Sequence, residues 1–263
     1  MQPPAFSGVR KNHAHLWTCF MTILRALVFN LYFVLLTIVM GIGAFPIRLF
    51  APRLALGYAK MWTGLTLRGL QHICNIKIEV SGREHLPHGP CLLACQHQSE
   101  FDTLVWMNLV PRPTYVMKRE LERIPLVGPM LRLSGMIPVD RDGKAKALRA
   151  LLAATDAAVA DQRQIIIFPE GTRTAPGAPI SLQPGIAALS THTGLPVIPV
   201  ATDAGLHWKR NALIKQPGTI HIVIGHPLPA GLRRAQLLPA IGDAWRHLCT
   251  DNGLPVPAPR ERV

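Results

Sequence analysis

The sequence places a histidine and an aspartate at the two ends of a short polar stretch, His97-Gln-Ser-Glu-Phe-Asp102. An imidazole accepts a proton near neutral pH, and a carboxylate beside it orients the ring and stabilises the imidazolium. The pair therefore suggests a general base with its orienting carboxylate. The spacing also fits a simpler interpretation, in which Asp102 or Ser99 caps the following helix, because both residue types favour helix N-termini.

A second polar stretch, Phe168-Pro-Glu-Gly-Thr-Arg173, combines groups that suit an anionic ligand. The missing side chain at Gly171 lets a ligand approach the backbone, and Thr172 and Arg173 carry donors for a phosphate. The alternative is an ordinary turn after a strand, with Arg173 in solvent. A third stretch, 118–141, carries Lys118 and Arg141 at its ends around an apolar middle, and alone such a stretch is more often a surface helix and turn than a site.

Both polar stretches follow short apolar runs, residues 91–96 and 164–168, that are typical of buried strands. Further strands are predicted over 75–80, 114–117, 196–200 and 219–224, and helices over 101–110, 144–161 and 234–249. Strands that alternate with helices predict an α/β fold, a mostly parallel central sheet flanked by helices. Polar residues that follow parallel strands lie at the carboxyl edge of such a sheet, so we expect the two stretches to meet there.

Composition excludes several other classes of protein. The chain has 263 residues, of which 49% are hydrophobic and 16% charged, which argues against disorder and is enough for one large domain. Its five cysteines include no C-x-x-C pair, so a disulfide scaffold and a zinc ribbon both fit poorly and a reducing compartment is favoured.

The first part of the chain has the composition of a membrane anchor. The net charge is +13, and the first acidic residue is Glu79. Residues 26–47 carry no charge and would form a helix about 33 Å long, the thickness of a bilayer core. A signal peptide and a buried core helix are the alternatives, and a hairpin dipping into one leaflet with 49–70 remains open beside a full span. The flanking cations predict that the remaining chain is cytoplasmic.

The motifs taken together resemble those of a known family. H-x4-D is followed in order by K-x-x-L-x-x-I-P-x-x-G from Lys118, G-x-x-x-V-D-R ending at Arg141, F-P-E-G-T-R and V-I-P-V at 197–200. This order, with the lead-in Gly82-Arg-Glu-His-Leu-Pro87, resembles the glycerolipid acyltransferase family, which includes bacterial 1-acyl-sn-glycerol-3-phosphate acyltransferases. The resemblance covers residues 75–225.

The resemblance implies a role for each matching residue. His97 would be the general base, oriented by Asp102. The acceptor would be bound by Lys118, Arg141, Glu170, Gly171, Thr172 and Arg173. It implies transfer of an acyl chain from acyl carrier protein or coenzyme A to a lysophosphatidic-acid-like acceptor, with no metal and no cofactor. The residue patterns divide the chain into N-terminal membrane-anchoring helices over 1–72, an α/β domain over 73–252, which the resemblance makes the acyltransferase domain, and a loose Pro-rich tail over 253–263. Together with the resemblance they predict an enzyme on the cytoplasmic face of a bacterial inner membrane, in contact with membrane lipids and not nucleic acid.

One position departs from the family pattern, and two other functions stay open. Family members commonly carry a basic residue in the stretch that here reads Ser181-Leu-Gln-Pro-Gly185, where Gln183 is neutral. This leaves room for another lysolipid, such as a lyso-ornithine lipid or a lysophospholipid, as the acceptor. Cys95, close to His97, raises the alternative of a thioester or lipid hydrolase. A catalytically silent basic membrane adaptor is the third hypothesis.

Overall fold

The computed structural model describes residues 8–140 and 144–259, which form a seven-stranded sheet flanked by helices. The strands are β1 (Ile76–Ser81), β2 (Cys91–Cys95), β3 (Pro113–Lys118), β4 (Ile137–Val139), β5 (Gln164–Ile167), β6 (Val197–Thr202) and β7 (Gly218–Ile224). Their order in the sheet is β1-β7-β6-β2-β5-β3-β4, and all neighbours are parallel except β6 and β7. The predicted fold class is confirmed.

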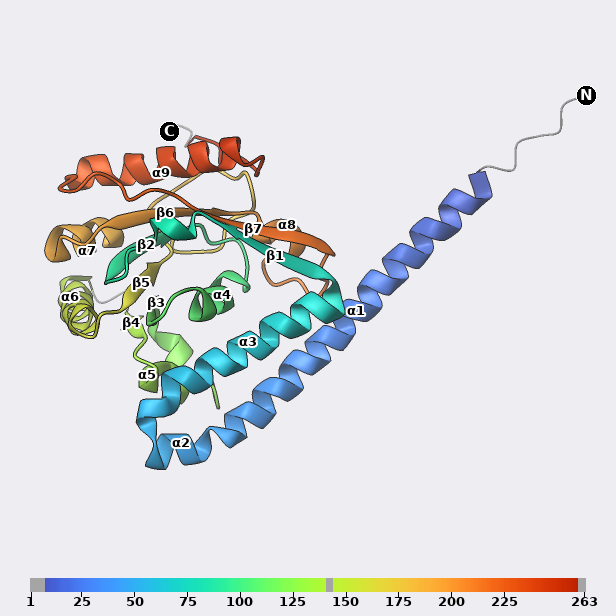
Figure 1. Cartoon of the computed structure of the whole chain (residues 1–263), viewed down its shortest axis with the longest axis horizontal. Coiled ribbons are helices and arrows are strands. Elements are labelled where there is room, and N and C mark those ends of the chain that lie inside the picture. Colours follow the sequence, from blue (N-terminus) through green and yellow to red (C-terminus); the bar gives the residue numbers. More distant parts are fainter. Residues whose placement is uncertain (1–7, 141–143, 260–263) are drawn as a thin grey trace, which may run out of the picture.

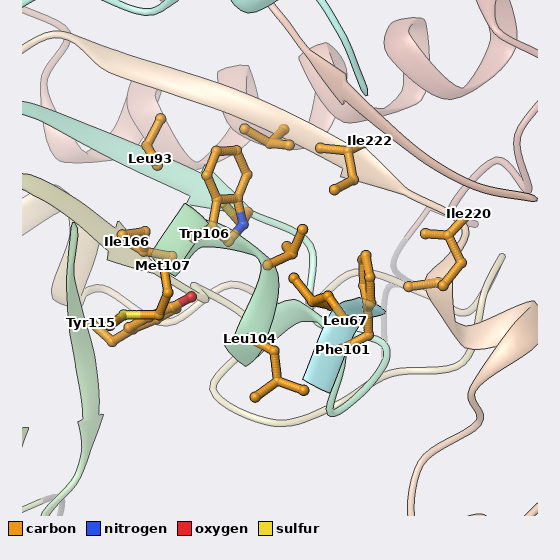
Figure 2. Packing of buried hydrophobic residues seen from close by; sticks show 14 of the residues in the cluster. Leu67, Leu93, Phe101, Leu104, Trp106, Met107, Tyr115, Ile166, Ile220 and Ile222 are labelled. Carbon is orange, nitrogen blue, oxygen red and sulfur yellow. The ribbon is translucent and has the colours of Figure 1, made fainter. Parts of the chain in front are cut away.

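Helices cover both faces of the sheet (Figure 1). One face carries α4 (Asp102–Leu109) together with the N-terminal helices, and the other carries α6 (Lys144–Ala160), α7 (Gly185–Thr193) and α9 (Arg234–Asp251). The strand β2 is buried over its whole length because both of its faces are covered. Figure 2 shows the first face, where Trp106 and Met107 of α4 lie toward Leu93, Ile166 and Ile222 of the strands.

The predicted strands and helices are all present, with ends shifted by a few residues. The sequence patterns missed β4, α7 and the short helices η2 (Arg83–His85) and α8 (Ala204–His207), and they gave no bounds for η3 (Arg119–Arg123) and α5 (Gly128–Leu133) within 118–141. The strand β4 has only three residues and includes Pro138, and α5 begins with Gly-Pro. Elements this short show no clear periodicity, so contacts with the rest of the fold define them.

The N-terminal helices form a hairpin that lies along one side of the sheet (Figure 1). It consists of α1 (Gly8–Gly43), α2 (Phe45–Phe50), η1 (Pro52–Leu54) and α3 (Ala55–Cys74). Tyr32 Oη donates to Leu65 O at 2.9 Å, and Tyr58 Oη donates to Met40 O at 2.8 Å. At Gly69, a Cβ atom would lie 2.2 Å from the Tyr32 ring, so a glycine is needed where α1 and α3 pack.

The hairpin leaves a long apolar surface exposed. The segment Trp17–Phe50, which runs through α1 and α2, contains an 18-residue window with a mean hydropathy of 2.2 and is long and apolar enough to cross a membrane. From Ala26 onward one side of α1 is buried against the protein, as Phe29 and Met40 show. The other side exposes Phe20, Leu24, Leu27, Leu31, Val34, Ile38, Ile42 and Phe45. The helix is therefore covered on one side and apolar on the side that faces solvent.

The tail that we expected to be loose is held against the protein as far as residue 258. Leu254 is buried, and Ala258 N donates to Gly177 O at 3.1 Å. Ile180 N donates in turn to Ala258 O at 3.3 Å. These contacts join the tail to the loop over 175–180, which follows the second polar stretch.

Candidate active site

Three neighbouring parallel strands bring the predicted residues to one edge of the sheet. β2, β5 and β3 lie side by side and run in the same direction. His97 follows β2, the stretch 168–173 follows β5, and Lys118 ends β3. Side-chain amides extend the contacts of β2 beyond its end, because Gln96 Oε1 accepts from Thr202 N at 3.0 Å and Gln98 Nε2 donates to Thr202 O at 2.7 Å. His97 is therefore held between two anchored residues.

His97 and Asp102 are in contact. His97 Nδ1 lies 3.2 Å from Asp102 Oδ2, and the Asp102 side chain is only 4% exposed. The same oxygen accepts from Gln98 N at 2.7 Å and from Ser99 N at 2.8 Å. All three contacts converge on one carboxylate oxygen, which fixes the imidazole. Ser99 Oγ also accepts from Phe101 N at 3.1 Å, so Ser99 and Asp102 hold the turn that opens α4. The structural interpretation therefore applies to Asp102 together with its contact to His97.

The His97 ring also packs against an aromatic residue of the second stretch. Phe168 stacks on it with ring centroids 4.1 Å apart, and Tyr115 of β3 stacks on Phe168 at 6.2 Å. The imidazole is therefore held by a carboxylate at its edge and by an aromatic ring on its face, which leaves few orientations for it.

Glu170 links the two motifs through the backbone. Its Oε2 accepts from His97 N at 2.5 Å, and its Oε1 accepts from the hydroxyl of Thr174. Thr174 N donates to His97 O at 2.8 Å, so both backbone polar groups of His97 bond to the 168–174 loop. Burial is the main cause that raises the pKa of Glu170 to about 7. The hydrogen bonds from Thr174 and His97 act in the opposite direction and lower this pKa.

This raised pKa predicts a pH-dependent stability. The folded protein retains the Glu170 proton up to about pH 7, whereas the unfolded chain loses it near 4.5, so stability falls as pH rises from 4.5 through 7. The shift corresponds to about 3 kcal/mol. Glu170→Gln keeps a neutral side chain at every pH. Between pH 5 and 8 we expect the thermal midpoint of the wild type to fall by about 5–10 °C relative to this variant.

The measurement is thermal unfolding of both proteins in the same neutral detergent across that pH range. The comparison cancels the titration of histidines, which both proteins share. A difference between the two midpoints that stays constant from pH 5 to 8 would show that Glu170 does not retain its proton.

Arg173 is held by groups from two other segments. Its Nη1 donates to the Glu100 carboxylate and to Asn211 Oδ1 at 3.2 Å, and Asn211 N donates to Glu100 Oε1 at 3.2 Å. Arg210 Nη1 donates to Arg173 O at 3.4 Å. Glu100 neutralises the charge of Arg173, whereas Arg210 forms no ion pair with any residue that the structure describes. Arg210 therefore adds net positive charge beside Arg173.

These residues open onto a cavity of about 480 Å³. Its polar end is lined by His97, Lys118, Gly171, Thr172, Arg173, Arg210 and Asn211. Its other end is apolar and lies between the N-terminal hairpin, β3 and α5, where it is lined by Met40, Ala44, Trp62, Leu126, Met130 and Met136. The volume lies within the range of small-molecule sites in proteins. A base, cations and an apolar channel thus share one cavity.

The structure brings most of the predicted site residues together. Lys118, Gly171, Thr172 and Arg173 line the cavity with His97, and a positive φ of 71° at Gly171 suits glycine. Asp102 and Glu170 lie behind His97 and do not line the cavity. Arg141 lies outside the described residues. Gln183 is exposed and does not line the cavity, so its neutral side chain removes no charge from it.

The sequence analysis missed Arg210 and Asn211. Both come after β6, whose end lies at the same edge of the sheet as that of its parallel neighbour β2. The signal was the pair of cations Lys209-Arg210, which follows V-I-P-V at 197–200. We used V-I-P-V only as a family motif and did not consider the cations after it. Glu100, between His97 and Asp102, was also missed as the partner of Arg173.

Cys95 is not placed to react. Its side chain is 2% exposed, it does not line the cavity, and burial raises the pKa of its thiol well above the ordinary value. A thiolate is the nucleophilic form of cysteine, so this surrounding disfavours it. Among residues 8–140 and 144–259, no group of three or more His, Cys, Asp or Glu side chains is placed to hold a metal ion.

Comparisons with known proteins agree with these features. Residues 77–203 match the model of the family described as Acyltransferase. The chain is 35% identical over 176 residues to a 1-acyl-sn-glycerol-3-phosphate acyltransferase of Pseudomonas aeruginosa, covering 66% of this chain and 68% of that protein. It is 30% identical over 166 residues to the protein of that name from Cocos nucifera, covering 62% of this chain and 54% of that one.

A solved structure shares the fold. The crystal structure of the 1-acyl-sn-glycerophosphate (LPA) acyltransferase PlsC from Thermotoga maritima superimposes with a TM-score of 0.72 at 21% identity, covering 88% of this chain and 98% of that one. At this level of sequence identity, the structural similarity shows a shared fold and nothing about function. The family model over 77–203 includes His97, Asp102 and the 168–173 stretch, and the Pseudomonas relative is matched over 68% of its own length. The chain therefore belongs to the acyltransferase family.

Proposed function

We propose that the protein transfers a fatty acyl chain from acyl carrier protein or coenzyme A to the sn-2 hydroxyl of 1-acyl-sn-glycerol-3-phosphate. The product is phosphatidic acid, which serves phospholipid synthesis. The observation that carries this proposal is one cavity that holds a base, a group of cations and an apolar channel. The names of the relatives from Pseudomonas aeruginosa and Cocos nucifera support the same acceptor.

His97 activates the acceptor hydroxyl. Its Nδ1 donates to Asp102, so Nε2 is the nitrogen that takes the proton. The alcohol oxygen attacks the thioester carbonyl and forms the new C–O bond, and the C–S bond then breaks. The proton held on Nε2 passes to the departing thiolate, which leaves as a thiol. Asp102 stabilises the transient imidazolium, and the mechanism uses no cofactor besides the acyl thioester.

The cations hold the acceptor phosphate. Arg173 and Arg210 come from different loops and both line the polar end of the cavity, with Lys118 on a third segment. The hydroxyl of Thr172 adds a donor, and the missing side chain at Gly171 lets the phosphate approach the loop. The apolar end of the cavity suits an acyl chain, because the residues that line it are methionines, leucines and an aromatic ring. Holding both substrates is worth about 7–11 kcal/mol at best in such reactions.

We propose that the enzyme acts on the cytoplasmic face of a bacterial inner membrane, with α1 in the interface and not along the membrane normal. A helix that crossed the bilayer alone would be surrounded by lipid. Here Phe29, Met40 and Ala44 are buried against the protein, and the opposite side of the helix is apolar and exposed. This arrangement supports a helix that lies in the interface with one side in the lipid.

The test is acyl transfer by the purified full-length protein in neutral detergent. Lysophosphatidic acid is supplied with acyl-coenzyme A or acyl carrier protein, and phosphatidic acid, free thiol and free fatty acid are measured. We expect phosphatidic acid and thiol in equal amounts, also in the presence of EDTA. If diacyl product forms only with another lysolipid, that lysolipid is the acceptor and the proposed acceptor is wrong. If free fatty acid forms without diacyl product, the protein is a hydrolase.

Arg210→Gln tests the binding of the phosphate. Removing one charged donor is expected to raise KM for lysophosphatidic acid about 10-fold with little change in kcat. A neutral monoacylglycerol acceptor would be unaffected, because it offers no charge to the lost guanidinium. Lys209→Gln is the matched control, since Lys209 is an exposed cation that does not line the cavity. Equal effects of the two variants would show that only the overall charge matters.

A further inference from the structure

The loop over residues 209–215 exposes an apolar tip beside α1. Leu213 is 71% exposed and Ile214 is 43% exposed. Asn30 of α1 donates from Nδ2 to Leu213 O at 2.9 Å, so the tip lies against this helix. Leu27 and Val34 of α1 are three residues before and four residues after Asn30, on the same side of the helix, and both are exposed. The tip therefore extends the exposed apolar surface of α1.

A buried lysine holds the tip in place. Lys215 is 3% exposed, and its Nζ donates to the side chain of Asn30 and to Leu213 O at 3.1 Å. The ammonium group also lies 4.7 Å from the centre of the Trp208 ring and 5.4 Å from that of Phe29. A cation over aromatic faces is a favourable contact. The exposed tip is thus fixed to α1 and keeps its apolar side chains outward.

Cations lie next to the tip. Lys209 and Arg210 are exposed in the same loop, and Arg210 and Asn211 line the polar end of the cavity. Apolar side chains flanked by Lys and Arg are the composition that binds an anionic lipid surface, because the side chains enter the acyl boundary while the cations attract headgroups. The net charge of +13 acts in the same direction.

We propose that the 209–215 loop is a second membrane-binding element, which inserts Leu213 and Ile214 into an anionic bilayer beside α1. This rests on the proposed membrane location of the enzyme. Insertion would place the polar end of the cavity at the level of the headgroups. An acceptor lipid would then reach Arg210 and His97 while its acyl chain stays in an apolar surrounding.

Depth-dependent fluorescence tests the insertion directly. The Cys19→Ser background removes the cysteine that is exposed in the described part of the chain. In this background a single cysteine replaces Leu213, Val39 or Leu148, and it is labelled with an environment-sensitive fluorophore. Val39 is 67% exposed on α1, and Leu148 is 41% exposed on α6, which covers the opposite face of the sheet. The full-length proteins are added to phosphatidylglycerol-containing vesicles with nitroxide-labelled lipids.

We expect a blue shift and quenching at positions 213 and 39, and none at 148. Quenching at 39 without quenching at 213 would overturn the loop proposal and leave the anchor intact. Quenching at none of the three positions would overturn both. A signal at 213 that responds to acyl carrier protein and not to vesicles would also overturn the proposal, since the partner would then be a protein.

An activity measurement separates this proposal from the proposed function. The Leu213→Gln/Ile214→Gln variant is expected to transfer acyl chains several-fold more slowly to an acceptor embedded in anionic vesicles. This is roughly the effect of losing two apolar side chains that are partly buried in the bilayer. Transfer to a short-chain, monomeric acceptor is expected to stay at the wild-type level, because neither residue lines the cavity. Leu148→Gln is the control. Equal losses on both acceptors would overturn the loop proposal, and no transfer by the wild type would overturn the proposed function instead.

Discussion

Replacing His97 by alanine is expected to lower kcat for acyl transfer by about 10²–10⁴-fold, the usual contribution of a general base. The imidazole is the one titratable group that lines the cavity and is also bonded to a buried carboxylate among the described residues. KM for the acceptor is expected to change little, because the phosphate is bound by other residues. Steady-state kinetics with saturating acyl donor measure both constants.

Cys95→Ala is the control for this result. Cys95 is buried two residues before His97 and does not line the cavity, so a small, neutral replacement leaves the base in place. We expect activity close to that of the wild type. Loss of activity in Cys95→Ala with full activity in His97→Ala would reject base catalysis by the imidazole.

Replacing Asp102 by asparagine is expected to lower kcat on the order of 10³-fold, with the fold unchanged. His97 Nδ1, Gln98 N and Ser99 N all contact the single oxygen Oδ2, so an asparagine oxygen at the same place keeps these three contacts. Only the negative charge is lost. At 3.2 Å, its interaction with an imidazolium is worth about 5 kcal/mol at an effective dielectric constant of 20.

Asp102→Ala distinguishes charge from structure. It leaves Gln98 N and Ser99 N buried with no acceptor, at a cost of about 1–3 kcal/mol each in the free energy of unfolding. We therefore expect a lower thermal midpoint in Asp102→Ala but not in Asp102→Asn, and a large loss of kcat in both. An active Asp102→Asn protein would assign Asp102 a purely structural role.

The sequence predicts the sheet and the two central motifs well because their signals are local. Residues 91–95 and 164–167 are apolar runs without interruption, and each is followed at once by polar residues. The carboxyl ends of parallel strands lie at the same edge of a sheet, so the sequence alone predicts that His97 and Arg173 lie at one edge.

Contacts between distant segments could not be predicted in this way. Arg210 lies 37 residues from Arg173 in the chain, and Glu100 reaches Arg173 across 73 residues. No periodicity encodes such pairs, since they depend on where loops after different strands end. The role of Lys215 was equally hidden, because an isolated lysine in a loop is expected in solvent, whereas this one is buried against two aromatic rings.

The two hydrogen bonds that the backbone of His97 makes with the 168–174 loop have a consequence for protein engineering. The Glu170 side chain accepts from His97 N, and Thr174 N donates to His97 O. The backbone position of His97 therefore depends on the conformation of the 168–174 loop. A chimera that takes one motif from a relative and keeps the other from this chain would join two loops that did not evolve as partners. Donor and acceptor preferences are therefore best transplanted with both loops as a single cassette.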